Sequence, residues 1–166
     1  MTDTEVREDA ATNAPPDESA RNVAPADLTR LYEDSRIRVA WYAGRCIHSA
    51  ACIRALPGVF DPHRRPWIDL SRGEADDIAN AVERCPTGAL EYLRLDSGPN
   101  ERAPEHPTVV PVRNGPLFVR GDVEVKDEQG KVLRRGTRLA FCRCGQSNHL
   151  PFCDNTHRAI GFRTVK

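Results

Sequence analysis

The sequence predicts an α+β protein that consists of two small domains. Three features of its 166 residues support this prediction: two separate groups of cysteines, a polar stretch with three prolines between them, and a change of hydrophobic pattern across that stretch. Helix and strand patterns alternate before the stretch, whereas short alternating runs separated by turns follow it. We therefore expect an α+β domain over residues 35–95, a linker over 96–107 and a small β-rich domain over 108–166.

The first 34 residues differ from the rest of the chain in charge and composition. They hold nine acidic and three basic residues, a net charge of −6, and are rich in Ala and Pro but poor in aromatic residues. This composition predicts a disordered tail over residues 1–34, either freely solvated or folded over the body of the protein. The body carries +6, but its basic residues alternate with acidic ones, so we do not expect it to bind nucleic acid.

The six cysteines indicate metal rather than disulfides. The N-terminus has neither a basic start nor an apolar run, so no signal peptide is expected. No stretch reaches the roughly 18–20 apolar residues of a membrane span, so no membrane association is expected either. We therefore place the protein in a reducing cytoplasm, where clustered cysteines favour metal binding.

The first domain is predicted to have the order β-α-β-α-β. Its elements are a strand that leads to the first cysteine, a short helical turn, a short strand, an amphipathic helix and a final strand. They are expected within residues 35–47, 49–60, 64–70, 73–85 and 88–95. The amphipathic helix has apolar residues at i, i+3, i+4 and i+7 and acidic residues in its first turn. Trp41, Phe60 and Trp67 are expected in the core of this domain.

The second domain begins with short alternating runs that predict hairpins. Turn signals occur at Asn114-Gly115, Gly121-Asp122 and Gln129-Gly130. The chain then ends in "FCRCGQSNHLPFCDNTH", with the spacing C-x-C-x8-C-x3-H. Four soft ligands in so short a run predict a metal centre, and the spacing alone allows either zinc or an iron–sulfur cluster. The candidate ligands are Cys142, Cys144, Cys153 and His157.

The residues between these ligands narrow the choice of metal. With Ser147, Pro151 and Asp154 included, the run closely resembles the CDGSH iron–sulfur domain, the family of the NEET proteins. The resemblance implies that Cys142 and Cys144 bind one iron of a 2Fe–2S cluster and that Cys153 and His157 bind the other. It also implies that the serine, the proline and the aspartate surround the cluster. A histidine ligand should give an intermediate reduction potential that depends on pH.

The "CDNTH" turn carries one departure from the family pattern. Asn155 stands where the family has glycine. Because asparagine also tolerates a positive φ, we expect the turn to form. Asp154 is expected to cap a short helix by accepting a hydrogen bond from the backbone N–H of Thr156 or His157.

Three further residues near this motif have open roles. His149 matches no ligand position and is expected to be an exposed loop residue. Arg138 and Arg143 either offset the charge of the cluster or form a plain solvated face.

The first domain carries a second cysteine pattern. Cys46-x2-Ser49-x2-Cys52 is followed at a distance by Cys85 in "CPTGAL". Bacterial ferredoxins use C-x2-C-x2-C and a distant C-P. Residues 36–93 therefore resemble the mono-cluster ferredoxins, in particular their divergent 4Fe–4S subgroup, which implies a ferredoxin-like fold.

Serine replaces the middle cysteine of that pattern, which leaves three thiolates. The resemblance implies either a 3Fe–4S cluster or a 4Fe–4S cluster whose fourth ligand is Ser49, His48 or solvent. The alternative is that the three cysteines are structural residues of the core.

The sequence shows no Ser-His-Asp order, P-loop or dinucleotide-binding glycine motif, so we do not expect an enzyme. Two clusters on one chain predict a one-electron carrier that serves unidentified redox proteins. An iron–sulfur sensor or cluster-transfer protein is the first alternative, and a zinc-stapled interaction module is the second. The C-terminal domain could form a homodimer, as its family does, or the N-terminal domain could fill that role.

Overall fold

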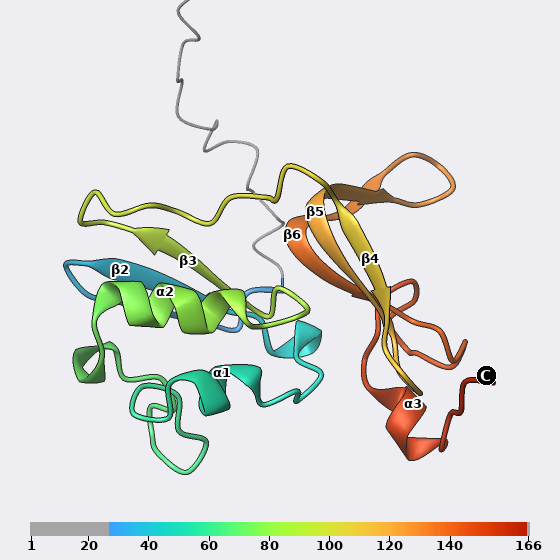
Figure 1. The fold of residues 1–166 in the computed structure, drawn as a ribbon, viewed down its shortest axis with the longest axis horizontal. Helices are drawn as coiled ribbons and strands as arrows, with labels where there is room; N and C mark the ends of the chain where they lie inside the picture. Colours follow the sequence, from blue (N-terminus) through green and yellow to red (C-terminus); the bar gives the residue numbers. More distant parts are fainter. Residues whose placement is uncertain (1–26, 166) are drawn as a thin grey trace, which may run out of the picture.

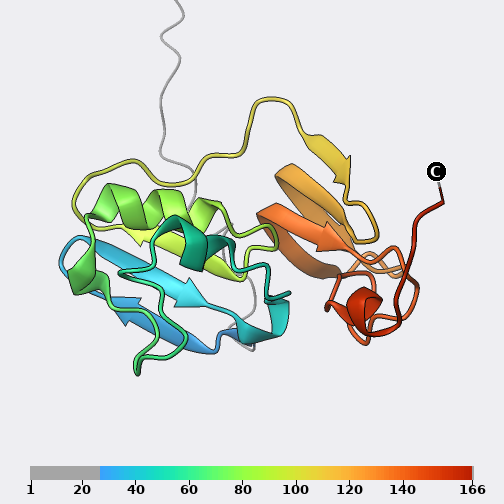
Figure 2. The same ribbon diagram turned by 60° about the horizontal axis from the view of Figure 1, so that its bottom comes forward.

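The structure is a computed structural model that describes residues 27–165. It contains two antiparallel sheets of three strands each, in the orders β1-β2-β3 and β4-β5-β6. The two sheets form separate lobes, and the segment between β3 and β4 joins them along the outside of the molecule (Figures 1 and 2). This layout confirms the predicted α+β class. Among residues 27–165, no helix has the length and apolar character that a bilayer span requires.

The N-terminal sheet is built around its central strand, β2. The strands are β1 (Arg30–Glu33), β2 (Ile37–Trp41) and β3 (Leu90–Arg94). Ile37 and Val39 on β2 are fully buried, and Val39 lies opposite Tyr32 and Tyr92 on the two outer strands. The helical elements are η3 (Ala43–Arg45), α1 (Ala51–Ala55), η4 (Leu70–Arg72) and α2 (Ala75–Glu83). Helix α2 packs on β3, and α1 packs beside α2 (Figure 1).

The predicted amphipathic helix is confirmed as α2. Its apolar residues Ala75, Ile78, Ala79 and Val82 are all buried, as the i, i+3, i+4, i+7 spacing requires. The expected aromatic contacts are also present. Phe60 is fully buried, while Trp41 and Trp67 pack at the edge of the core with ring centroids 5.1 Å apart.

Two predictions for this domain are wrong. The acidic tail was expected to reach residue 34, but Arg30–Glu33 forms β1 because the buried Tyr32 extends the core and the strand pairs with the free edge of β2. Residues 1–26 of that tail lie outside the described residues. The strand expected at residues 64–70 is reduced to one bridge between Phe60 and Ile68, followed by η4, because Pro66 has no N–H to donate to a ladder.

The C-terminal sheet is dominated by one long hairpin. Strand β4 (Thr108–Pro111) pairs with β5 (Leu117–Lys126), which pairs with β6 (Val132–Phe141), and the short helix α3 (Thr156–Ala159) follows. The predicted turns at Asn114-Gly115 and Gln129-Gly130 are confirmed: Asn114 and Gly130 have φ values of 55° and 83°. The turn predicted at Gly121 is wrong, because this residue lies inside β5 at an irregularity of the register.

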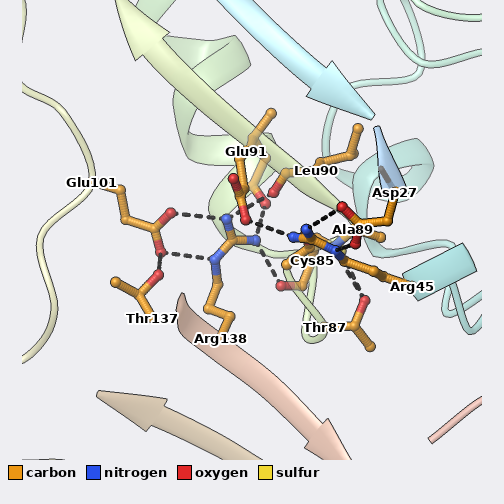
Figure 3. A network of polar contacts seen from close by, with 12 residues as sticks. Asp27, Arg45, Cys85, Thr87, Ala89, Leu90, Glu91, Glu101, Thr137 and Arg138 are labelled. Atoms are coloured by element: carbon orange, nitrogen blue, oxygen red, sulfur yellow. Dashed lines mark hydrogen bonds and ion pairs between the residues drawn. The ribbon is translucent and has the colours of Figure 1, made fainter. Parts of the chain in front are cut away.

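Arg138 on β6 joins the two domains. Its side chain is 2% exposed and lies against the N-terminal domain, while Glu101 of the connecting segment pairs with it at 2.7 Å (Figure 3). The prediction that Arg138 belongs to a solvated face is therefore wrong, whereas the alternative, that it offsets the charge of the C-terminal cluster, stays a prediction. Sequence patterns could not reveal this, because the acceptors of Arg138 lie about fifty residues away along the chain.

This pair predicts that stability depends on pH. Burial alone would raise the pKa of Glu101, but hydrogen bonds from Arg138, its charge and the Thr137 hydroxyl lower it. The lowered pKa adds stability above the unfolded value of about 4.3, and this stability is lost as pH falls through the folded value. We expect Glu101→Gln to cost about 2–3 kcal/mol at neutral pH.

The cost should shrink progressively as the pH falls from the unfolded pKa of about 4.3 through the lower folded pKa, because protonation of wild-type Glu101 removes the charge that Gln lacks. Denaturant unfolding of both proteins from pH 7 down to pH 3 measures the difference. A difference that stays constant over this range would contradict the pairing.

Candidate metal centres

The C-terminal ligands are brought together where the final loop folds back onto the end of β6. Cys142 directly follows this strand, and its N–H donates to the carbonyl of Pro151 at 2.9 Å. The N–H of Cys153 donates to the carbonyl of Ala140 at 2.8 Å. These two hydrogen bonds hold Cys153 beside the start of the loop, and α3 then supplies His157.

The four ligands form two pairs. The sulfurs of Cys142 and Cys144 are 3.6 Å apart, and the Cys153 sulfur lies 3.4 Å from Nδ1 of His157. Two thiolates on one tetrahedral metal with bonds of about 2.3 Å lie about 3.8 Å apart, so each pair has the separation that one metal atom requires. Within residues 27–165, no three His, Cys, Asp or Glu side chains are arranged around a single ion. The site thus consists of two neighbouring pairs, one half-buried and one buried.

Backbone N–H groups favour the thiolate at Cys142. Burial alone would raise the pKa of this thiol, but the N–H groups of Ser147 and Gly145 and the neighbouring Cys144 thiol lower it. Burial raises the pKa of Cys153, and the N–H of Asn155 partly opposes this at 3.4 Å from the sulfur. The loop therefore presents N–H donors to both pairs of ligands.

The surroundings of His157 favour its neutral imidazole form. Burial lowers its pKa, the charge of Arg158 lowers it further, and Asp154 opposes the shift. A neutral imidazole keeps a ring nitrogen lone pair free for a metal. The 7% exposed side chain also places that nitrogen away from bulk water.

Asp154 holds the ligand loop together. Its Oδ1 accepts the expected hydrogen bond from the N–H of Thr156 at 3.0 Å, although Asn155 occupies the N-cap position of α3, and its Oδ2 accepts from the N–H of Asn148 at 2.9 Å. Burial would raise its pKa, but these hydrogen bonds lower it far below the usual range. Asn155 has a φ of 77°, so the expected left-handed turn forms without glycine.

Ser147 and Pro151 support the same loop. The buried Ser147 hydroxyl donates to the carbonyl of Phe152 at 2.7 Å and accepts from the N–H of His149 at 3.0 Å. The peptide bond before Pro151 is cis. His149 itself is exposed, and Arg143 donates to the carbonyl of Val112 at 3.1 Å.

The three N-terminal cysteines line one cavity. Cys46 follows η3, Cys52 lies in the first turn of α1, and Cys85 follows α2. Together with Trp41 and Trp67, they line one small cavity that is partly open to solvent, which we call the N-terminal cavity. Two neighbouring helical elements, η3 and α1, and the more distant α2 thus place the three cysteines around a single space.

Burial disfavours the thiolate form of two of these residues, Cys46 and Cys52. Burial raises the pKa of Cys52 to about 11, and the charge of Cys85 adds to the shift. Burial also raises the pKa of Cys46, although the N–H of His48 opposes it. Metal coordination deprotonates a thiol outright, so a bound metal would favour the thiolate form that burial disfavours.

The two candidates for a fourth ligand differ in position. Ser49 lines the N-terminal cavity, whereas His48 does not. Both neighbours of Ser49 have a positive φ, 53° at His48 and 56° at Ala50, and these values bend the loop around the serine.

Sequence reasoning missed two residues at these sites. The buried Thr87 places its hydroxyl 3.6 Å from the Cys85 sulfur, and its presence in the "CPTGAL" run was the available signal. Ile47 lines the N-terminal cavity and also packs in a buried cluster with Ala140 and Cys153 of the C-terminal domain. Nothing in the sequence signals that contact, because it depends on how the two domains meet.

The two ligand groups and the domains that carry them define an iron–sulfur protein. Residues 32–95 match the family model described as a divergent 4Fe–4S mono-cluster, and residues 114–158 match the one described as an iron-binding zinc finger of CDGSH type. The chain therefore belongs to the divergent 4Fe–4S mono-cluster family and carries a CDGSH-type iron-binding domain after it. This confirms both resemblances seen in the sequence.

Two curated relatives come from Escherichia coli. The protein YjdI of strain K12, described as uncharacterized, is 32% identical to this chain over 63 residues, which are 38% of this chain and 83% of YjdI. The YjdI protein of strain O157:H7 gives the same values. The similarity supports family membership without adding an activity.

We predict that Asp154→Ala weakens metal retention at the C-terminal site. The variant loses two acceptors that hold the ligand loop, and loss of a helix cap costs about 1 kcal/mol, which corresponds to roughly fivefold faster release. Loss of visible absorbance in excess chelator measures the rate. Asp127→Ala is the matched control, since Asp127 accepts from Gln129 and Lys131 in the distant β5–β6 turn. Equal release rates in the two variants would contradict the role of Asp154.

Proposed function

We propose that this protein is a cytoplasmic one-electron carrier, and not an enzyme, whose two clusters lie close enough to exchange electrons within one chain. The observation that carries the proposal is the position of Ile47. This side chain lines the N-terminal cavity on one side and packs against the ligand Cys153 on the other. Bound clusters supply one-electron oxidation and reduction, and the packed side chains keep water out of the space between them.

The C-terminal ligands support a 2Fe–2S cluster. The two ligand pairs have the separations expected for two metal atoms, one pair for each. A mononuclear zinc ion would need all four donors around one point. The thiolate-favouring N–H groups near Cys142 suit a centre of net negative charge.

The N-terminal cavity supports a 4Fe–4S cluster with three cysteine ligands. Ser49 is better placed than His48 to act as the fourth ligand, because only the serine lines the cavity. The alternative 3Fe–4S cluster needs no fourth ligand and gives a distinct EPR signal in its oxidised state.

We propose that the partners are redox proteins and that the N-terminal domain takes the place of a second CDGSH subunit. The support is that Ile47 of the first domain covers Ala140 and Cys153 of the second. Because the N-terminal domain already covers this part of the C-terminal domain, less apolar surface remains there for a homodimer.

Cluster transfer is a second candidate function. Cys142 and Cys144 are only half-buried, whereas Cys153 and His157 are buried, so one ligand pair faces solvent. Transfer of an intact cluster to an apo-ferredoxin would favour this function over electron transfer.

Iron and sulfide analysis tests the cluster content. We expect about six irons per chain in the wild-type protein, a loss of about four in Cys52→Ala, and a loss of about two in Cys153→Ala. EPR of the oxidised protein distinguishes 3Fe–4S from 4Fe–4S. A colourless protein loaded with zinc would contradict the proposal.

Flash photoreduction tests electron transfer between the sites. After one-electron reduction, we expect a phase of electron redistribution whose rate does not change with protein concentration, because donor and acceptor share one chain. Cys153→Ala should abolish this phase, since the variant lacks the second cluster. If redistribution occurs only in collisions, with a rate proportional to concentration, the two clusters are not a functional pair.

A further inference from the structure

Arg138 is the most completely bonded buried charge in the described part of the chain. A guanidinium has five N–H donors. Nε and Nη2 donate to the two carboxylate oxygens of Glu101 at 2.7 and 2.8 Å. Nη1 donates to the carbonyls of Val82 and Cys85 at 2.6 and 2.7 Å, and Nη2 also donates to the carbonyl of Leu90 at 2.9 Å. All five donors are thus used, and three of them bind the segment that carries Cys85.

The segment from Val82 to Leu90 packs against Arg138 on β6. Cys85 and Leu90 both line the N-terminal cavity, so two of the three carbonyls that Arg138 binds belong to residues of the candidate metal site. Gly88 lies at the turn between them with a φ of 66°, and a Cβ there would come within 3.0 Å of the Arg138 carbonyl oxygen. Nη1 of Arg45 donates to the carbonyl of Gly88 at 3.3 Å.

The ion pair of Arg138 and Glu101 has a defined direction relative to the N-terminal cavity. Glu101 lies on the Nε and Nη2 edge of the guanidinium, while Nη1 points toward Cys85 (Figure 3). The positive end of the pair therefore faces the metal site, and the negative end faces the connecting segment. The second buried arginine, Arg45, is balanced by Asp27 and Glu91 at 2.7 and 2.8 Å. Because the group is buried, its field is screened less than that of a surface charge.

We propose that Arg138 is a positioning residue for the N-terminal cluster: it fixes the turn from Cys85 to Leu90 and raises the reduction potential of the cluster. The inference rests on the proposed function, because it assumes that a cluster occupies the N-terminal cavity. Reduction adds one negative charge, and an oriented positive charge beside a ligand stabilises the reduced form. The C-terminal domain thereby sets the potential of a site in the other domain.

Two variants with opposite expected shifts test the proposal. Arg138→Met removes the positive charge and should lower the potential of the N-terminal cluster. Glu101→Gln removes the balancing negative charge while Arg138 stays charged, and it should raise the same potential. Potentiometric titration followed by EPR resolves the two clusters in the intact protein. If Arg138 were only structural, both variants would loosen the same contact and shift the potential in the same direction.

Arg135→Met is the matched control. Arg135 lies on the same strand and loses the same charge, but its partner is the exposed Glu124 and its side chain is 49% exposed. We expect no shift of the N-terminal potential in this variant. An equal shift in Arg135→Met and Arg138→Met would overturn the proposal, since the effect would then be one of overall charge.

The outcomes separate this inference from the proposed function. If the wild-type protein holds no N-terminal cluster, the proposed function fails first. If the cluster is present but Arg138→Met leaves its potential unchanged or raises it, only the inference fails. Should Arg138→Met not fold, Glu101→Gln alone decides: a raised potential supports the proposal, and an unchanged or lowered one overturns it.

Discussion

The buried guanidinium of Arg138 is the interaction on which the arrangement of the two domains depends. An arginine with 2% exposure costs several kcal/mol in desolvation unless its donors and its charge are satisfied. Here the acceptors come from the N-terminal domain and the connecting segment, while the arginine comes from the C-terminal sheet. Neither domain satisfies this group alone, so the two domains must meet in one orientation. That orientation brings Ile47 against Cys153.

Both metal centres combine reactive ligands with a backbone that is already shaped to hold them. At the C-terminal site, the β-bridge between Phe141 at the end of β6 and Phe152 in the last loop fixes the ligand loop without a metal. At the N-terminal site, burial raises the pKa of Cys46 and Cys52, so the thiols gain their charge only together with a metal. Metal binding and folding are therefore linked at this site.

Local patterns predicted local structure well. The apolar spacing gave α2, the Asn114-Gly115 pair gave a turn, and the residues between the ligands identified the CDGSH-type domain. The failures involve long-range contacts. The polar composition of β1 predicts that it belongs to the tail, although its buried Tyr32 packs in the core. A solvated face is one of the two roles that the sequence suggests for Arg138, because arginine usually lies at the surface.

The sequence by itself determined the candidate ligands and how close the partners of each C-terminal pair lie, because one to three intervening residues leave the chain little freedom. Tertiary structure decided what those ligands face. It placed Ser49 rather than His48 in the N-terminal cavity, and it packed Ile47 between the two sites. These outcomes depend on how two sheets pack about one buried ion pair, and contacts between residues fifty or more positions apart leave no periodic trace in the sequence.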